Sequence, residues 1–192
     1  YDRLKEEADF AFVLNPRLKE GELLGVICRE FGIQEVGVEA LAKRLLERAE
    51  QGRRNILVVD EAQSLPDSSL EYIRLLTNLE VENRRLLQVI FFAQPEVEAR
   101  LEQPHLRQLR QRIVLQVKLT FLDEASTEAY IRHRVERAGG GSFIRFDASA
   151  VRKIFQLTGG APRLINKVCE LGLRCAAFRQ TRLVTGDLIN EM

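Results

Sequence analysis

Residues 56–61 have the sequence Ile-Leu-Val-Val-Asp-Glu, and this stretch decides the fold. Four aliphatic residues that end in two carboxylates are typical of a buried parallel strand, which delivers its acidic residues to the carboxyl edge of a sheet. Nucleotide-hydrolysing α/β proteins hold magnesium and the attacking water at this edge. The stretch therefore predicts part of a nucleotide site, with Asp60 and Glu61 as its acidic residues.

The 192 residues contain no phosphate-binding motif to match this acidic strand. No stretch fits G-x-x-x-x-G-K-[ST], and no glycine is followed by lysine. Without backbone N–H groups and a lysine around the phosphates, Asp60 and Glu61 would repel ATP. We interpret the three glycines at 139–141 as a flexible turn, because no strand leads into them and no lysine follows. The sequence thus resembles most of an ATPase rather than all of one.

Composition indicates a soluble globular chain. The 29 Lys and Arg residues nearly balance the 28 Asp and Glu residues, so no overall field favours nucleic acid. Cys28, Cys169 and Cys175 lack C-x-x-C spacing and histidine partners, which favours reduced packing residues in a cytosolic setting. No apolar run has the length of a membrane span, and no signal-peptide pattern opens the chain. The first residue, Tyr1, suggests a piece of a longer polypeptide.

Strand and helix patterns alternate over the first 120 residues, which predicts a mainly parallel sheet sandwiched by helices. Beyond them the pattern changes to helices alone, with Asp123, Asp147 and Thr185 as N-cap residues. We therefore divide the chain into an α/β unit at 1–120 and a small all-α unit at 121–192. The strands that we expect in the first unit lie at 8–15, 56–59, 86–93 and 113–119, and its helices at 23–31, 38–49, 66–79, 96–102 and 105–111.

Four segments occur in the order that is seen in AAA+ ATPases. They are residues 56–61, the strand that ends at Gln94-Pro95-Glu96, the segment 109–113 and the stretch 159–166. As a set they resemble the ATPase domain of the general secretion pathway protein A (ExeA-like) family, and the resemblance runs from about Ala8 to the C-terminus. It implies a partial P-loop NTPase (AAA+) sheet that lacks its N-terminal Walker A strand, followed by a helical lid.

The resemblance assigns catalytic roles to three residues at the sheet edge. Asp60 matches the Walker B aspartate, which holds Mg²⁺, and Glu61 matches the base that activates water. Hard oxygen ligands suit Mg²⁺, and a carboxylate suits proton abstraction. Gln94 matches sensor 1, whose amide can contact the γ-phosphate and the water. Alternatively, the acidic pair only caps the helix that follows, and Gln94 is only a turn residue before Pro95.

Several arginines match positions that act on the nucleotide in this superfamily. Arg107, Arg110 and Arg112 occur where an arginine finger is aimed at a neighbouring subunit, and Arg110 or Arg112 is the better candidate. A guanidinium suits the task because it is permanently charged and forks onto phosphate oxygens. Arg163 matches sensor 2 at the start of a lid helix. The alternatives are an ordinary solvated surface and a plain helix start, and we interpret residues 15–17 as a structural turn.

The resemblance implies an ATPase that uses ATP and Mg²⁺ and assembles as a homo-oligomer through arginine-finger contacts. Its relatives are bacterial cytoplasmic ATPase domains, attached to the inner membrane, that assist type II secretion or pilus-type machinery in the envelope. In the family the phosphate loop follows a strand between those that we expect at 86–93 and 113–119. We therefore expect strand, loop and helix upstream of this chain, and expect the chain alone to be inactive.

Two other functional classes stay open from the sequence. One is a DNA-binding ATPase of the transposition-helper kind, which the charge balance disfavours. Its DNA would require a local basic face, for which the chain offers Arg107, Arg110, Arg132, Arg134 and Arg174. The other is a non-catalytic nucleotide-sensing scaffold, in which Glu61 would have no measurable role.

Overall fold

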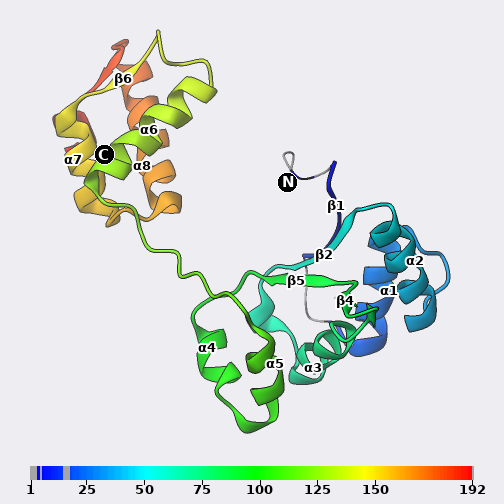
Figure 1. The fold of residues 1–192 in the computed structure, drawn as a ribbon. Coiled ribbons are helices and arrows are strands. Elements are labelled where there is room, and N and C mark those ends of the chain that lie inside the picture. Colours follow the sequence, from blue (N-terminus) through cyan, green and yellow to red (C-terminus); the bar gives the residue numbers. More distant parts are fainter. Residues whose placement is uncertain (1–3, 5, 15–17, 192) are drawn as a thin grey trace. The chain divides into compact units, whose positions relative to one another are not determined.

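The computed structural model describes residue 4, residues 6–14 and residues 18–191. The chain forms two compact units, Tyr1–Gln116 and Val117–Met192, and each is described by itself (Figure 1). The expected turn at residues 15–17 lies outside the described residues.

The first unit is built on a three-stranded parallel sheet. Its strands are β1 (Ala8–Val13), β2 (Arg54–Val59) and β5 (Gln88–Phe91), in the order β1-β2-β5. The last residues of the three strands are paired in register, so their carboxyl ends meet at one edge. The predictions of a parallel sheet and of a buried strand that leads to Asp60 are confirmed, and this strand, β2, lies between the other two.

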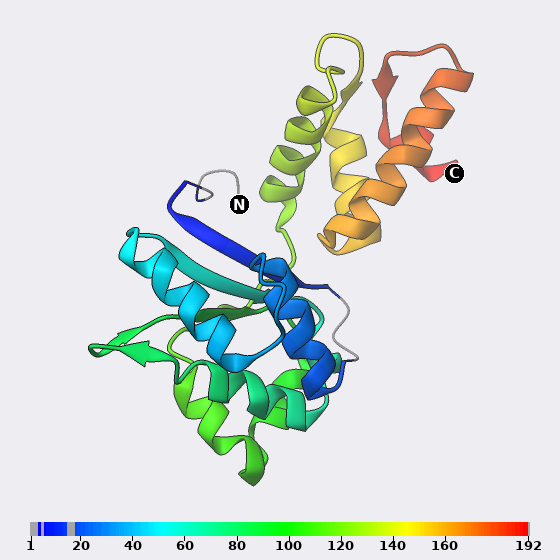
Figure 2. The ribbon, with the colours of Figure 1, turned by 90° about the vertical axis from the view of Figure 1, so that its right-hand side faces the viewer.

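Three helices cover one face of this sheet, as Figure 2 shows. They are α1 (Glu20–Glu30), α2 (Val38–Glu50) and α3 (Asp67–Leu76). Gly32 and Gly52 follow α1 and α2 with φ values of 74° and 75°, a left-handed conformation that glycine adopts without a Cβ penalty. The core between helices and sheet includes Leu23, Ile27, Leu41, Leu45, Leu57, Leu70 and Ile73, each at most 1% exposed.

A short hairpin between α3 and β5 was not expected from the sequence. It consists of β3 (Glu80–Val81) and β4 (Arg84–Arg85), which pair antiparallel. Glu82 and Asn83 form the turn with φ values of 49° and 63°. Two successive left-handed residues fit a two-residue type I′ turn. Asn83 was the available signal, because asparagine is enriched in the left-handed conformation.

After β5 the chain continues as short helices: α4 (Glu96–Leu101), the 3₁₀ turn η2 (Pro104–Leu106) and α5 (Arg107–Arg112). Leu106 and Leu109 anchor this part in the core of the first unit, since they are 0% and 3% exposed.

The prediction of a strand at 113–119 is wrong. The segment forms no strand, and beyond the half-buried Ile113 its aliphatic side chains are exposed to solvent: Val114 is 91%, Leu115 78%, Val117 69% and Leu119 85% exposed. A strand needs a neighbour for its backbone N–H and C=O groups, and among the described residues β5 pairs only with β2. The alternating apolar pattern is present, but no strand among the described residues pairs with this segment.

The second face of the sheet carries a smaller apolar cluster, which consists of strand residues alone among the described part of the chain. Its members are Ala8, Phe10, Phe12, Ile56 and Val58. The rings of Phe10 and Phe12 stack with centroids 6.0 Å apart. Towards the β5 edge this face becomes open, since Ile90 and Phe92 are 42% and 52% exposed.

The second unit is a bundle of α6 (Glu124–Arg137), α7 (Ala148–Thr158), α8 (Pro162–Phe178) and the short α9 (Gly186–Asn190). The two-residue strands β6 (Arg145–Phe146) and β7 (Leu183–Val184) pair in parallel at its side.

The helix starts in this unit follow the sequence. The Asp123 carboxylate accepts the N–H of Ser126 at 2.7 Å, and the Asp147 carboxylate accepts the N–H of Ala150 at 2.8 Å. These bonds satisfy backbone donors that the first helical turn leaves without partners. The side-chain hydroxyls of Ser126 and Ser149 hold the pKa of Asp123 and Asp147 below the usual range, and the backbone N–H donors lower it further.

Gly160 lies between α7 and α8, in close contact with the backbone of Leu122. Its φ is 78°, and its C=O accepts the N–H of Leu122 at 3.0 Å. An ideal Cβ on Gly160 would lie 1.8 Å from the Leu122 carbonyl oxygen. Glycine is therefore required here for both conformation and space.

Candidate nucleotide site

Asp60 and Glu61 follow directly on the central strand β2 and are exposed at the carboxyl edge of the sheet. The Asp60 N–H donates to the Val13 carbonyl at 3.0 Å, which extends the pairing with β1 by one residue. The Glu61 N–H donates to Asp60 Oδ1 at 2.9 Å. Glu61 has a φ of 51°, a left-handed conformation that is uncommon for a non-glycine residue and is frequent at functional sites.

Gln94 reaches the same edge from the end of β5. Its side-chain Nε2 donates to Glu61 Oε2 at 3.2 Å, so the sensor candidate and the base candidate are in direct contact. Gln63, in the 3₁₀ turn η1 (Ala62–Ser64), also donates through its Nε2 to Glu61 Oε2. The Gln94 N–H in turn donates to Gln63 Oε1 at 3.1 Å. Three polar side chains from two strand ends therefore form one closed network.

Backbone bonds hold the two strand ends together beneath this network. The Phe92 N–H donates to the Val59 carbonyl at 2.8 Å, and the Ala62 N–H donates to the Phe92 carbonyl at 2.9 Å. The positions of Glu61 and Gln94 thus follow from continued pairing beyond the last residues of β2 and β5.

Arg100, on α4, stabilises the turn that contains Gln63. Its guanidinium donates to the carbonyls of Gln63 and Leu65 at 2.6 and 2.8 Å, and it forms an ion pair with Asp67. His105 Nε2 lies 2.8 Å from the other Asp67 oxygen. The Arg100 guanidinium, and after it His105, hold the pKa of Asp67 below its usual range. Sequence reasoning missed Gln63 and Arg100, and only the position of Gln63 two residues after Glu61 offered a signal.

The donor set at this edge fits Mg²⁺ through a single carboxylate. Asp60 Oδ1 accepts the Glu61 N–H, and Asp60 Oδ2 has no donor within the described part of the chain. No group of three or more His, Cys, Asp or Glu side chains that could enclose a metal occurs among the described residues. Mg²⁺ is typically bound by one or two carboxylates together with waters and nucleotide phosphates, so Asp60 is the residue that would hold it.

Arg107, Arg110 and Arg112, the candidates in the first unit, form no hydrogen bond with this network among the described residues. Arg110 forms an ion pair with Glu102, and both side chains are more than half exposed. Arg107 is exposed, and Arg112 is half-buried at the end of α5. Arg163 is exposed in the first turn of α8, in the second unit. An exposed ion pair is worth little, so Arg110 can leave Glu102 at small cost.

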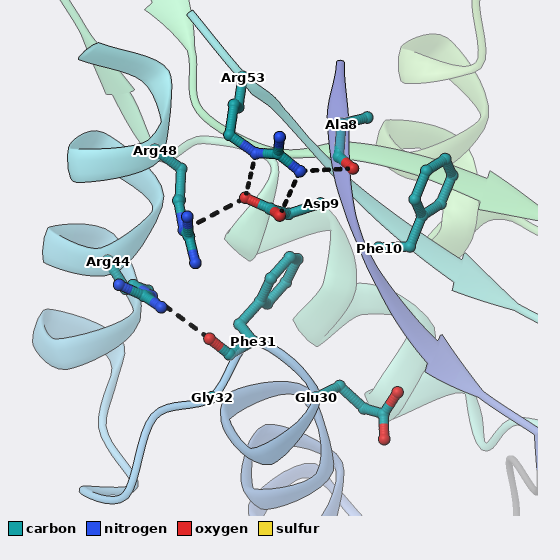
Figure 3. A pocket seen from close by; sticks show the side chains of 9 residues that line it. All are labelled: Ala8, Asp9, Phe10, Glu30, Phe31, Gly32, Arg44, Arg48 and Arg53. Atoms are coloured by element: carbon teal, nitrogen blue, oxygen red, sulfur yellow. Dashed lines mark hydrogen bonds and ion pairs between the residues drawn. The ribbon is translucent and has the colours of Figure 1, made fainter. Parts of the chain in front are cut away.

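A pocket of about 320 Å³ lies at the other end of the strands (Figure 3). Arg44 and Arg48 project into it from successive turns of α2, and Arg53 precedes β2. Arg53 donates two hydrogen bonds to the Asp9 carboxylate, from Nε to Oδ2 at 3.1 Å and from Nη2 to Oδ1 at 2.8 Å. Arg48 Nε lies 3.2 Å from Asp9 Oδ2. These contacts neutralise Asp9 and tie the start of β1 to α2 and β2.

The guanidinium of Arg53 holds the pKa of Asp9 below its usual value, and the charges of Arg48, Arg53 and Arg44 lower it further against the effect of burial. Arg44 donates more loosely to the Phe31 carbonyl, at 3.4 Å. The pocket is thus an ion-pair cluster that fixes the amino edge of the sheet, whereas the carboxylate and amide groups gather at the carboxyl edge.

Adjacent carboxylates and a polar amide at the ends of neighbouring parallel strands, with a helical unit after them, are the features of a nucleotide-binding ATPase domain. A family model described as "AAA domain" matches residues 2–101. The chain belongs to this AAA domain family, which confirms the AAA+ resemblance of its motifs.

One relative extends this likeness along the whole chain. General secretion pathway protein A of Aeromonas hydrophila is 40% identical over 194 residues, which cover 97% of this chain. The match spans 35% of that relative's own length, so the chain corresponds to about a third of it.

Solved structures agree on the fold. The ORC2 protein of Aeropyrum pernix, in ADPNP-ADP complexes, gives a TM-score of 0.68 at 13% identity over 99% of this chain and 53% of its own. The RuvB Holliday junction branch migration motor of Thermotoga maritima gives a TM-score of 0.59 at 14% identity over 98% of this chain and 62% of its own.

Among the described residues, no helix has the length and apolarity needed to cross a membrane.

Proposed function

We propose that this chain forms the Walker B, sensor and lid parts of an AAA+ ATPase that hydrolyses ATP to drive assembly of a secretion or pilus-type system. The observation that carries the proposal is the 3.2 Å hydrogen bond from Gln94 Nε2 to Glu61 Oε2. It joins an amide and a carboxylate at the ends of two neighbouring parallel strands, where ATP-hydrolysing folds keep their attacking water.

In this proposal Glu61 takes a proton from a water molecule while the water oxygen attacks the γ-phosphorus of ATP. The bond from that phosphorus to the β–γ bridging oxygen breaks, and ADP and phosphate leave. Gln94 orients the water through its side-chain amide. Asp60 holds Mg²⁺, whose charge, when it is bound, neutralises the terminal phosphates.

Two further contacts to the nucleotide belong to the proposal. Arg110 or Arg112 acts as a finger on the nucleotide of a neighbouring subunit, which makes the working form a homo-oligomer. The exposure of Arg110 and its weak pairing with Glu102 support this role. Arg163 contacts the γ-phosphate from the second unit, which acts as a lid. Its exposure in the first turn of α8 supports this role.

We also propose that a further strand with a phosphate loop completes the sheet between β5 and the segment 113–119. The outer edge of β5 has no partner among the described residues. The segment 113–119 has a strand pattern but stands in solvent. A strand inserted between them would pair with both and would bring backbone N–H donors and a lysine to the phosphates.

We propose envelope or secretion-machinery proteins as partners, which the relative's name, general secretion pathway protein A, supports. The location that we propose, a cytoplasmic ATPase attached to the inner membrane, rests on the resemblance to this family. DNA binding has less support, because the 29 Lys and Arg residues nearly balance the 28 Asp and Glu residues, so no overall field attracts nucleic acid.

Calorimetric titration with Mg²⁺-ATP tests the proposal. The 192-residue chain is compared with a longer polypeptide that adds the proposed strand and phosphate loop. We expect micromolar binding by the longer polypeptide, weakened by Asp60→Asn, and no detectable heat from the shorter one. Equal affinity of the two would contradict the proposed completion of the site, and no binding by either would contradict the ATPase.

A further inference from the structure

Gln63 forms hydrogen bonds with both Glu61 and Gln94, the two residues that we propose to contact the attacking water. It is half-buried in the turn η1, whereas Glu61 and Gln94 are exposed. Its backbone carbonyl accepts Arg100 Nη1 at 2.6 Å, so the residue is fixed from the side of α4.

Both polar atoms of the Gln63 side-chain amide form hydrogen bonds. Its Oε1 accepts the Gln94 N–H at 3.1 Å, and its Nε2 donates to Glu61 Oε2. The Gln94 side chain donates to the same Oε2 at 3.2 Å. Glu61 Oε2 therefore has two amide donors, while Oε1 has none within the described part of the chain.

We infer that Gln63 is a positioning residue of the ATPase site, an inference that rests on the proposed function. By holding Oε2, it fixes the rotation of the Glu61 carboxylate and leaves Oε1 to accept the proton of the attacking water. It also fixes the backbone from which the Gln94 side chain projects. A glutamine suits this position because a neutral amide offers a donor and an acceptor at once.

Two substitutions of similar size separate this role from mere packing. Gln63→Met keeps the length of the side chain and removes both hydrogen bonds. Gln63→Glu keeps the acceptor and replaces the donor by a second carboxylate beside Glu61. The matched control is Gln34→Glu, at an exposed loop position between α1 and α2.

The test is ATP hydrolysis by the complete protein, with ATP affinity and the pH profile measured for each variant. We expect both Gln63 variants to lower kcat by about 10- to 100-fold, because a displaced reacting group is costly, while ATP affinity stays unchanged. Two close carboxylates disfavour each other's charged form, so Gln63→Glu should also move the acid limb of the kcat profile to higher pH. Gln34→Glu should behave as the wild type.

The possible outcomes distinguish a failure of the Gln63 inference from a failure of the proposed ATPase function. Wild-type kcat and pH profile in both Gln63 variants, with Glu61→Gln inactive, would overturn the inference and leave the ATPase standing. A fall in ATP affinity that accounts for the whole effect would also overturn it. Failure of the wild type to hydrolyse ATP, or full activity of Glu61→Gln, would contradict the proposed function itself.

Discussion

Replacing Asp9 by asparagine removes the charge at the centre of the arginine pocket while it preserves the shape of the side chain. In the wild type, Asp9 accepts two bonds from Arg53, at 3.1 and 2.8 Å, and Arg48 approaches to 3.2 Å. Arg53 keeps its bonds to the carbonyls of Glu6 and Ala8, at 2.9 and 3.2 Å, in the variant. We therefore expect β1 to remain paired but to be less stable.

The magnitude follows from the partial burial of the pair. Hydrogen bonds to charged groups contribute about 1.5–3 kcal/mol, and breaking a fully buried pair costs about 3–5 kcal/mol. The side chains of Asp9 and Arg53 are 23% and 26% exposed, so solvent screens part of this energy. We expect Asp9→Asn to lower the free energy of unfolding of the first unit by about 2 kcal/mol.

Urea unfolding followed by circular dichroism measures this loss, and hydrogen exchange of β1 and β2 peptides assigns it to the first unit. Glu47→Gln is the matched control, because its pair with Arg44 is longer, at 3.6 Å, and more exposed. The control should change the unfolding free energy by less than about 0.5 kcal/mol. An unchanged urea midpoint for Asp9→Asn would refute the reasoning.

The pH dependence supplies a second check on the same variant. Because Arg53 lowers the pKa of Asp9 in the folded state, its stabilisation is fully present above the unfolded pKa of about 3.9. It is lost as the pH falls through the lower folded pKa. The difference between wild type and Asp9→Asn should stay constant from about pH 5 to 8 and close in more acidic solution. A difference that persists unchanged in acid would contradict this account.

Three further predictions concern other parts of the chain. Arg100→Ala should lower the free energy of unfolding by about 2–3 kcal/mol in urea, because two backbone carbonyls lose their donor, whereas the exposed Arg152→Ala should have almost no effect. Gly160→Ala should destabilise the second unit by about 3 kcal/mol or more in thermal melts, through a positive φ and a carbonyl clash. Gly139→Ala has the positive φ but open space and should cost only about 1–2 kcal/mol. Burial raises the pKa of Cys169 to about 12, so iodoacetamide should modify it far more slowly than a free thiol at neutral pH, and rapid labelling would contradict this.

Local signals were sufficient to predict much of the fold. The apolar run before Asp60 predicted a buried parallel strand, and Gly32 and Gly52 predicted where two helices end. The caps Asp123 and Asp147 predicted helix starts. These features depend on residues a few positions apart, which sequence patterns report well.

The features that were missed depend on contacts between distant residues. Arg100 reaches the carbonyl of Gln63 across 37 positions, and Arg53 reaches Asp9 across 44. Neither pair leaves a periodic signal in the sequence. The strand expected at 113–119 failed for a related reason, because its pattern is local but its pairing requires a neighbouring strand.

Hydrolysis of ATP by the complete protein, compared between the wild type and Glu61→Gln, tests the central claim most directly. Glu50→Gln, at the exposed end of α2, serves as the control. The account predicts that Glu61→Gln binds Mg²⁺-ATP as tightly as the wild type but loses at least about 100-fold in kcat, since it removes the proton acceptor. Equal kcat values for Glu61→Gln and the wild type would contradict the assignment of Glu61 as the catalytic base.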